Sequence, residues 1–150
     1  MSDSPWPTPA KELAGYLRSY IQQMGLGSED PGVVIDRYHT PDIEWYNDGT
    51  RLDRDRLVAH ARPARKNAIA LDVEVHDALV AGDRVAARYT LHSTMRKGRR
   101  LSNEMYLFGE LAPDGRLRRV HSTSRDIPDQ AGQGWSTDAT QGQSTEATKG

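Results

Sequence analysis

The sequence predicts an α+β domain, with helices concentrated in its first half and an antiparallel sheet in its second. Three observations indicate this class. Apolar residues recur at helical spacing before residue 25, they alternate with polar residues from about residue 69, and three turn signals divide that second region into four strands. A chain of 150 residues, 36% of them apolar, suits one domain with one core.

The first helix is expected to begin at Thr8 and Pro9, which favour the N-cap and the first turn, and to end at Gly25. Its apolar stripe includes Tyr16 and Tyr20. A second, short helix fits residues 31–38, and a strand follows in "DIEWYND" at residues 42–48. A third helix is expected between an Asp53 cap and Pro63.

Four strands are expected in the remaining sequence: "IALDVEV", "RVAARYTLHSTM", "LSNEMYLFGEL" and "RLRRVHSTSRDI". The turns between them lie at residues 81–83, 97–98 and 113–115. Loops of three, two and three residues fix which residues stand opposite one another. In this register the face that receives the helices carries Val75, Tyr89, Tyr106 and Ser122 in one row, and Val73, Leu91, Glu104 and Ser124 in the next.

Glu104 is the unusual residue of this predicted face, because it stands among aromatic and aliphatic side chains. Burial would raise the pKa of its carboxyl group, and a carboxyl of that kind beside Tyr106 would suit a general acid or base. The alternative is that Glu104 pairs with an arginine near the rim, or that a slip in register turns it to water. Arg125 and Asp126 close the last strand, either as an ion pair with neighbours or as an anchor for an anionic group.

Composition excludes several classes of function. With 20 basic and 21 acidic residues, the formal net charge of −1 favours neither nucleic acid nor an anionic membrane as a partner. His76 and His121 would lie roughly 14 Å apart across the sheet, too far to share one metal ion. The sequence contains no cysteine, no leader-like start and no apolar run long enough for a membrane helix, so a cytoplasmic protein is expected.

The folded domain is expected to cover residues 8–127, after an N-terminal extension of residues 1–7. Residues 128–150 are rich in Gly, Gln, Ser and Thr and predict a disordered tail. Trp135 is the one large apolar residue of this tail, either an incidental exposed aromatic or part of a docking peptide.

The stretches "YHTPDIEWYNDGTRLDRDRLVAHARP", "VEVHDALVAGDRVAARYTLHST" and "NEMYLFGELAPDGRLRRVHS" resemble the SnoaL-like branch of the nuclear-transport-factor-two-like superfamily. The resemblance covers roughly residues 8–127. It implies a cone-shaped fold in which a curved sheet and about three helices enclose one apolar pocket, commonly in a homodimer. Similar proteins include polyketide cyclases, ketosteroid isomerases, scytalone dehydratases and limonene epoxide hydrolases, which need no cofactor.

The resemblance does not carry over the catalytic carboxylates of those enzymes. Where the isomerases have an aspartate on the first strand, this sequence has Asn47, and where the cyclases have one on the last strand, it has Ser122. Asn47 could orient a water or a carbonyl, or help form the turn with Asp48 and Gly49. Tyr16 and Tyr20 could equally be core residues.

The site predicted from sequence is therefore a pocket for a small hydrophobic, oxygenated molecule of polyketide, terpenoid or steroid type. Glu104 would abstract a proton beside a carbonyl, with Tyr106 and Asn47 stabilising the oxyanion. The substrate-binding residues would be Tyr16, Tyr20, Trp45, Tyr89 and Ser122. A non-catalytic carrier or sensor is the main alternative, and a self-associating module is a third. No metal or cofactor is expected, and a homodimer would form through the outer face of the sheet.

Overall fold

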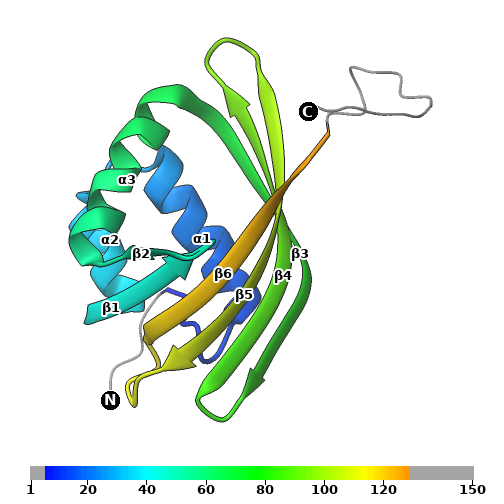
Figure 1. Cartoon of the computed structure of the whole chain (residues 1–150). Coiled ribbons are helices and arrows are strands. Elements are labelled where there is room, and N and C mark those ends of the chain that lie inside the picture. Colours follow the sequence, from blue (N-terminus) through cyan, green and yellow to red (C-terminus); the bar gives the residue numbers. More distant parts are fainter. Residues whose placement is uncertain (1–5, 129–150) are drawn as a thin grey trace.

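A computed structural model describes residues 6–128, which form three helices and six strands (Figure 1). The helices are α1 (Leu13–Leu26), α2 (Pro31–Tyr38) and α3 (Arg54–Asn67). The strands are β1 (His39–Asn47), β2 (Thr50–Leu52), β3 (Ala68–Ala81), β4 (Arg84–Met95), β5 (Arg100–Leu111) and β6 (Leu117–Ile127). Of the predicted tail, residues 129–150, with Trp135, lie outside the described residues.

The strands form one curved sheet in the order β2-β1-β6-β5-β4-β3. β3 to β6 make the predicted antiparallel meander, whereas β1 runs parallel to β6, so the sheet is mixed. All three helices lie on one side of the sheet (Figure 1). We call this covered side the inner face and the opposite side the outer face. The predicted α+β class is confirmed.

Several predicted element boundaries differ from the structure. α1 begins at Leu13 rather than after Thr8, whose hydroxyl instead accepts a hydrogen bond from the backbone N–H of Lys11 at 3.2 Å in a preceding turn. α3 continues past Pro63 to Asn67. The short strand β2 was not predicted, and its three residues pair with the end of β1.

The prediction placed β5 in the wrong register, because the turn before it is longer than expected. The backbone N–H of Met95 donates to Arg99 O at 2.8 Å, and the N–H of Gly98 donates to Met95 O at 2.8 Å. The loop therefore contains three residues, with Gly98 in the left-handed region at a φ of 82°. A strand that slips by one residue presents every side chain to the opposite face.

The slip exchanges the two faces of β5. Tyr89 stands opposite Met105, and Thr90 stands opposite Glu104. Leu107 consequently points into the core, whereas Tyr106 and Phe108 face outward with 42% and 63% of their surface exposed. The predicted inward positions of Glu104 and Tyr106 are therefore wrong.

The inner-face residues of β3, β4 and β6 stay on their predicted face. In β3 and β4 this is because two deviations from the predicted register cancel. The turn between β3 and β4 is one residue shorter than expected, since Ala81 pairs with Arg84, but an irregularity between Val75 and Asp77 restores the predicted pair of Val75 with Tyr89. Ser122 likewise remains on the inner face, now opposite Leu107.

The core lies between the helices and the inner face. Its fully buried members include Tyr16, Leu17, Ile35, Ile43 and Leu107. Within residues 6–128, no helix is long and apolar enough to span a bilayer.

Candidate functional site

An apolar cavity of about 320 Å³ lies between α1, α3 and the inner face of the sheet. Its walls are formed by Tyr20, Ile21, Met24 and Gly25 of α1, by Leu57, His60, Ala61 and Ala64 of α3, and by Ala68, Leu71, Leu91, Ser93, Met95 and Leu101 of β3 to β5. Tyr20, His60 and Ser93 contribute the polar side-chain groups, and none of the residues that line this cavity is acidic. A volume near the lower end of typical ligand sites suits a compact hydrophobic molecule.

The helix sequences explain why space remains here. Leu57, Ala61 and Ala64 recur at helical spacing along α3, so one face of this helix presents two small side chains toward the sheet. On α1, Gly25 has no side chain, and a Cβ atom at this position would overlap Cδ1 of Leu71. The small residues of α3 thus leave space beside the sheet, and Gly25 allows Leu71 to pack closely against α1.

Among the residues predicted to line a ligand pocket, Tyr20 lies in the wall of this cavity. Tyr16 and Tyr89 are instead buried in the core, with 0% and 4% of their surface exposed. Burial raises the pKa of Tyr16, Tyr20 and Tyr89 above the ordinary value for tyrosine, so all three stay neutral phenols at physiological pH.

Trp45, Asn47 and Ser122 do come together, as the sequence suggested. The indole Nε1–H of Trp45 donates to Ser122 Oγ at 2.9 Å, and the Ser122 hydroxyl donates to Asn47 Oδ1 at 2.8 Å. The turn after Asn47 uses Asp48 and Gly49, both with positive φ. Asn47 thus ends β1 before this turn, and its side chain joins β1 to β6.

His39 is a buried polar residue that directly follows α2, and the sequence prediction gave it no place in the site. Its Nδ1 lies 2.9 Å from Ile35 O, which can only accept a hydrogen bond, so Nδ1 carries the proton. Nε2 then accepts from the hydroxyl of Tyr16 at 2.7 Å. Burial lowers the pKa of His39 from 6.5 to about 4, so the imidazole is neutral near pH 7. No local pattern marks this role, because the partner hydroxyl belongs to Tyr16, 23 residues away in the sequence.

Glu104 lies on the outer face, between two arginines. Its Oε1 accepts from Arg125 Nε at 2.7 Å, and its Oε2 accepts from Arg88 Nη1 at 3.1 Å. The hydrogen bond from Arg125 is the main cause that holds the pKa of Glu104 below its ordinary value, and Arg88 adds to it. The raised pKa expected from sequence is therefore wrong in direction. Glu104 is still buried, with 7% of its surface exposed, but it lies on the outer face between two cations. The proposed proton transfer by Glu104, with Tyr106 beside it, therefore loses the inner-face location on which it rested.

Asp126 is an exposed carboxylate near the end of β6, on the same strand face as Ser122, and it is not among the residues that line the cavity. Asn103 Nδ2 donates to Asp126 Oδ1 at 2.6 Å across β5 and β6. Asn103 stands opposite Leu91 and two residues after Leu101, both of which line the cavity. The sequence raised Asp126 as an ion-pair partner or a rim anchor, but the register slip was needed to bring Asn103 beside it.

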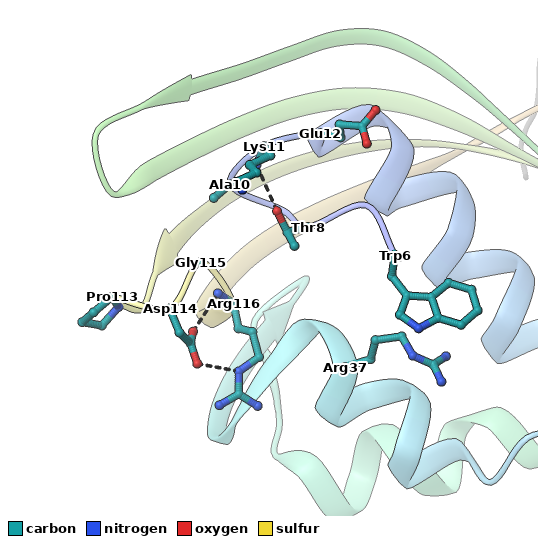
Figure 2. A pocket seen from close by; sticks show the side chains of 10 residues that line it. All are labelled: Trp6, Thr8, Ala10, Lys11, Glu12, Arg37, Pro113, Asp114, Gly115 and Arg116. Carbon is teal, nitrogen blue, oxygen red and sulfur yellow. Dashed lines mark hydrogen bonds and ion pairs between the residues drawn. The ribbon is translucent and has the colours of Figure 1, made fainter. Parts of the chain in front are cut away.

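A second cleft, of about 560 Å³, lies where the N-terminal segment meets α2 and the turn between β5 and β6 (Figure 2). It is polar. The Arg37 guanidinium lies 4.2 Å from the centre of the Trp6 ring. The Arg116 guanidinium pairs with Asp114 at 2.8 Å and donates to His39 O at 3.3 Å. These contacts hold the N-terminal segment and the turn against α2, so the cleft is a polar junction.

Within residues 6–128, no three His, Cys, Asp or Glu side chains come together as a possible metal site.

Comparisons with known proteins agree with the fold. The sequence profile of the SnoaL-like domain matches residues 17–120. No curated protein sequence matches the chain. Among solved structures, AclR from Streptomyces galilaeus, described as a candidate hydroxylase, is 22% identical with a TM-score of 0.54, over 61% of this chain and 74% of that one.

Two other similar structures are described as candidate polyketide cyclases. IdmH from Streptomyces antibioticus is 17% identical with a TM-score of 0.57, over 74% of this chain and 90% of that one. A SnoaL-like protein from Shewanella denitrificans OS-217 is 14% identical with a TM-score of 0.56, over 71% of this chain and 85% of that one. At these identities the likeness establishes a shared fold.

Proposed function

Because the chain belongs to the SnoaL-like domain family, we propose that it binds a small hydrophobic, oxygenated molecule in the cavity between α1, α3 and the sheet. The observation that carries this proposal is the cavity itself, whose wall is apolar apart from Tyr20, His60 and Ser93. Burying apolar ligand surface there contributes roughly 25 cal/mol per Å². The few polar groups would orient a carbonyl or hydroxyl group of the ligand.

The class of ligand follows from shape and from the fold's relatives. A compact polyketide-, terpenoid- or steroid-like molecule combines an apolar skeleton with a few oxygen atoms. Such a molecule matches a wall that is apolar except for three polar side chains. The similar proteins described as candidate polyketide cyclases support the same class.

The test is a fluorescence titration with 2-naphthol, a compact apolar molecule with one hydroxyl group. Ala64 lines the cavity, so Ala64→Phe should fill it and weaken binding by about tenfold or more. Ala59→Phe is the matched control, because Ala59 is an exposed residue of the same helix. Binding that survives Ala64→Phe unchanged in a folded variant would place the ligand elsewhere and overturn the proposal.

A second candidate function is catalysis of an isomerisation, cyclisation or dehydration of this ligand. Asp126 supports it, because this exposed carboxylate accepts a hydrogen bond from Asn103, which stands opposite Leu91 of the cavity wall. An ionised carboxylate could take a proton from a carbon next to a ligand carbonyl. A carrier would need no such group. Asp126→Asn should abolish turnover while 2-naphthol binding persists, and turnover that survives this change would exclude Asp126 as the base.

We further propose that two copies of the chain pair through the outer face. Leu79 and Phe108 are 67% and 63% exposed there, and with Tyr106 they border a concavity of about 340 Å³. Neighbouring exposed apolar side chains of this size are typical of an interface.

A further inference from the structure

We propose that Ser102, His92 and Glu74 form a nucleophilic site on the outer face of the sheet that hydrolyses small esters. His92 Nδ1 lies 2.8 Å from Ser102 Oγ, and His92 Nε2 lies 3.1 Å from Glu74 Oε1. A hydroxyl, an imidazole and a carboxylate are thus joined in series. This order of groups is the one that activates serine nucleophiles.

The hydrogen bonds fix the direction of proton transfer. The hydrogen bond with His92 is the main cause that lowers the pKa of Glu74, so this carboxylate is ionised at neutral pH and can only accept. His92 must then donate from Nε2, which leaves a lone pair on Nδ1. The Ser102 hydroxyl donates to that lone pair, so His92 is oriented to remove the serine proton.

The register of the sheet brings these residues together from three neighbouring strands. His92 on β4 stands directly opposite Ser102 on β5. On the other side it stands opposite Asp72 of β3, and Glu74 lies two residues further along the same face. The slip of β5 that turned Glu104 outward is therefore the same feature that placed Ser102 beside His92. Side chains on paired strands are held more precisely than side chains on loops.

A concavity of about 330 Å³ opens beside this triad. It is lined by His92, Ser93, Thr94, Arg100, Leu101 and Ser102. Two members of the triad therefore border a space that can hold a small molecule. Arg100 is the cationic residue of this lining, so an ester that carries a carboxylate is the substrate that best matches it.

The chemistry is an ordinary acyl transfer to water. Ser102 Oγ attacks the ester carbonyl carbon while His92 Nδ1 takes its proton. The bond from that carbon to the alcohol oxygen breaks, and the alcohol leaves with the proton from His92. Water then attacks the acyl-serine, gives a proton to His92 and releases the acid, after which the proton returns to Ser102. Ser102 and His92 are the catalytic residues of this scheme, and Glu74 is a positioning residue.

This site is separate from the apolar patch of the outer face, which consists of Leu79, Tyr106 and Phe108. Ser102 and Phe108 are six residues apart along β5, which corresponds to roughly 20 Å at about 3.4 Å per residue. The side chains of His92 and Glu74 are 43% and 58% exposed, so the triad is open to substrate in the single chain.

The first experiment is covalent labelling of the wild-type protein with an alkyl fluorophosphonate, which phosphonylates activated serines and releases fluoride. Peptide mass spectrometry should locate the label on Ser102. His92→Gln should slow labelling by about 100-fold. Ser28→Ala, which removes an exposed loop serine, should leave labelling unchanged. Labelling at another residue, or no labelling of the wild type, would overturn the proposal without any variant having to fold.

The second experiment is hydrolysis of 4-acetoxybenzoate and of phenyl acetate, which differ in the carboxylate that Arg100 would bind. Ser102→Ala should reduce both rates to the buffer rate, and Arg100→Gln should reduce only the preference for the anionic ester. Glu74→Gln should lower kcat by about tenfold or more and leave KM unchanged, because the amide no longer orients the imidazole, and Glu74→Asp should restore part of the rate. A rate in Ser102→Ala equal to that of the wild type would refute the assignment.

Discussion

The hydroxyl of Tyr16 donates a hydrogen bond of 2.7 Å to Nε2 of His39 inside the protein, where both residues have 0% of their surface exposed. The contact joins α1 to the first residue of β1, because His39 follows α2 directly. The rings of Tyr20, Tyr38 and Trp45 surround it, with centroids 4.7 to 6.3 Å from that of His39. Because neither side chain can reach water, the Tyr16 hydroxyl and His39 Nε2 each need the other as a hydrogen-bond partner.

Removal of the Tyr16 hydroxyl should therefore destabilise the fold. In Tyr16→Phe the ring still fills its place, but His39 Nε2 is left as a buried acceptor without this donor. We expect a loss of about 1–3 kcal/mol in the free energy of unfolding, measured by urea denaturation. Tyr46→Phe is a control, because Tyr46 is only half-buried. Equal stability of Tyr16→Phe and wild type would contradict the importance of this hydrogen bond.

The same burial predicts a pH dependence of stability. The folded pKa of His39 is about 4, below the ordinary 6.5, so the unfolded chain binds this proton more readily than the folded one. The contribution of the neutral imidazole to stability is therefore fully present above pH 6.5. As the pH falls from 6.5 toward 4, the free energy of unfolding should decrease by up to about 1.4 kcal/mol per pH unit.

Urea denaturation between pH 7 and pH 4.5 measures this loss before most carboxylates titrate. Asp36 and Glu104 have lowered pKa values, so their contributions disappear only at lower pH. A free energy of unfolding that stays level over this window would show that His39 is not held neutral by the fold.

The Glu104 position predicts a structural effect rather than a catalytic one. Glu104→Gln removes the charge between Arg88 and Arg125, which leaves Arg125 beside a neutral amide while Arg88 keeps its ion pair with Asp77. We expect the melting temperature to fall by a few degrees, more at low ionic strength than at high salt. Binding of 2-naphthol should be unchanged, because Glu104 lies on the opposite side of the sheet from the cavity. Weaker ligand binding in a stable Glu104→Gln protein would contradict this arrangement.

The proposed dimer predicts a change of mass in solution. Phe108→Lys places a charge in the centre of the exposed apolar patch, where it would have to be desolvated on association. Sedimentation velocity should show a dimer for the wild type and a shift toward monomer for this variant. Val33→Lys is the control, because Val33 is 51% exposed on α2, away from the sheet. A wild-type protein that is monomeric at high concentration would reject the dimer.

The sequence by itself determined the class of fold and most of its elements. Helical spacing in α1 and α2, the Asp53 cap of α3 and the alternation in β4 are local properties, so they could be seen without coordinates. The faces of β4 were also predictable, because Ala87, Tyr89 and Leu91 alternate there with polar residues. Helical spacing likewise placed Tyr20 on the buried stripe of α1.

The tertiary structure decided the face of β5 and, with it, the chemistry of the site. The strand "LSNEMYLF" has large apolar residues at both parities, so its own pattern does not choose a face, and one residue in the preceding turn made the choice. That residue turned Glu104 toward Arg88 and Arg125 and set Ser102 against His92. Contacts between strands depend on register, which is a property of the turn and the whole sheet, and so the local sequence could not reveal them.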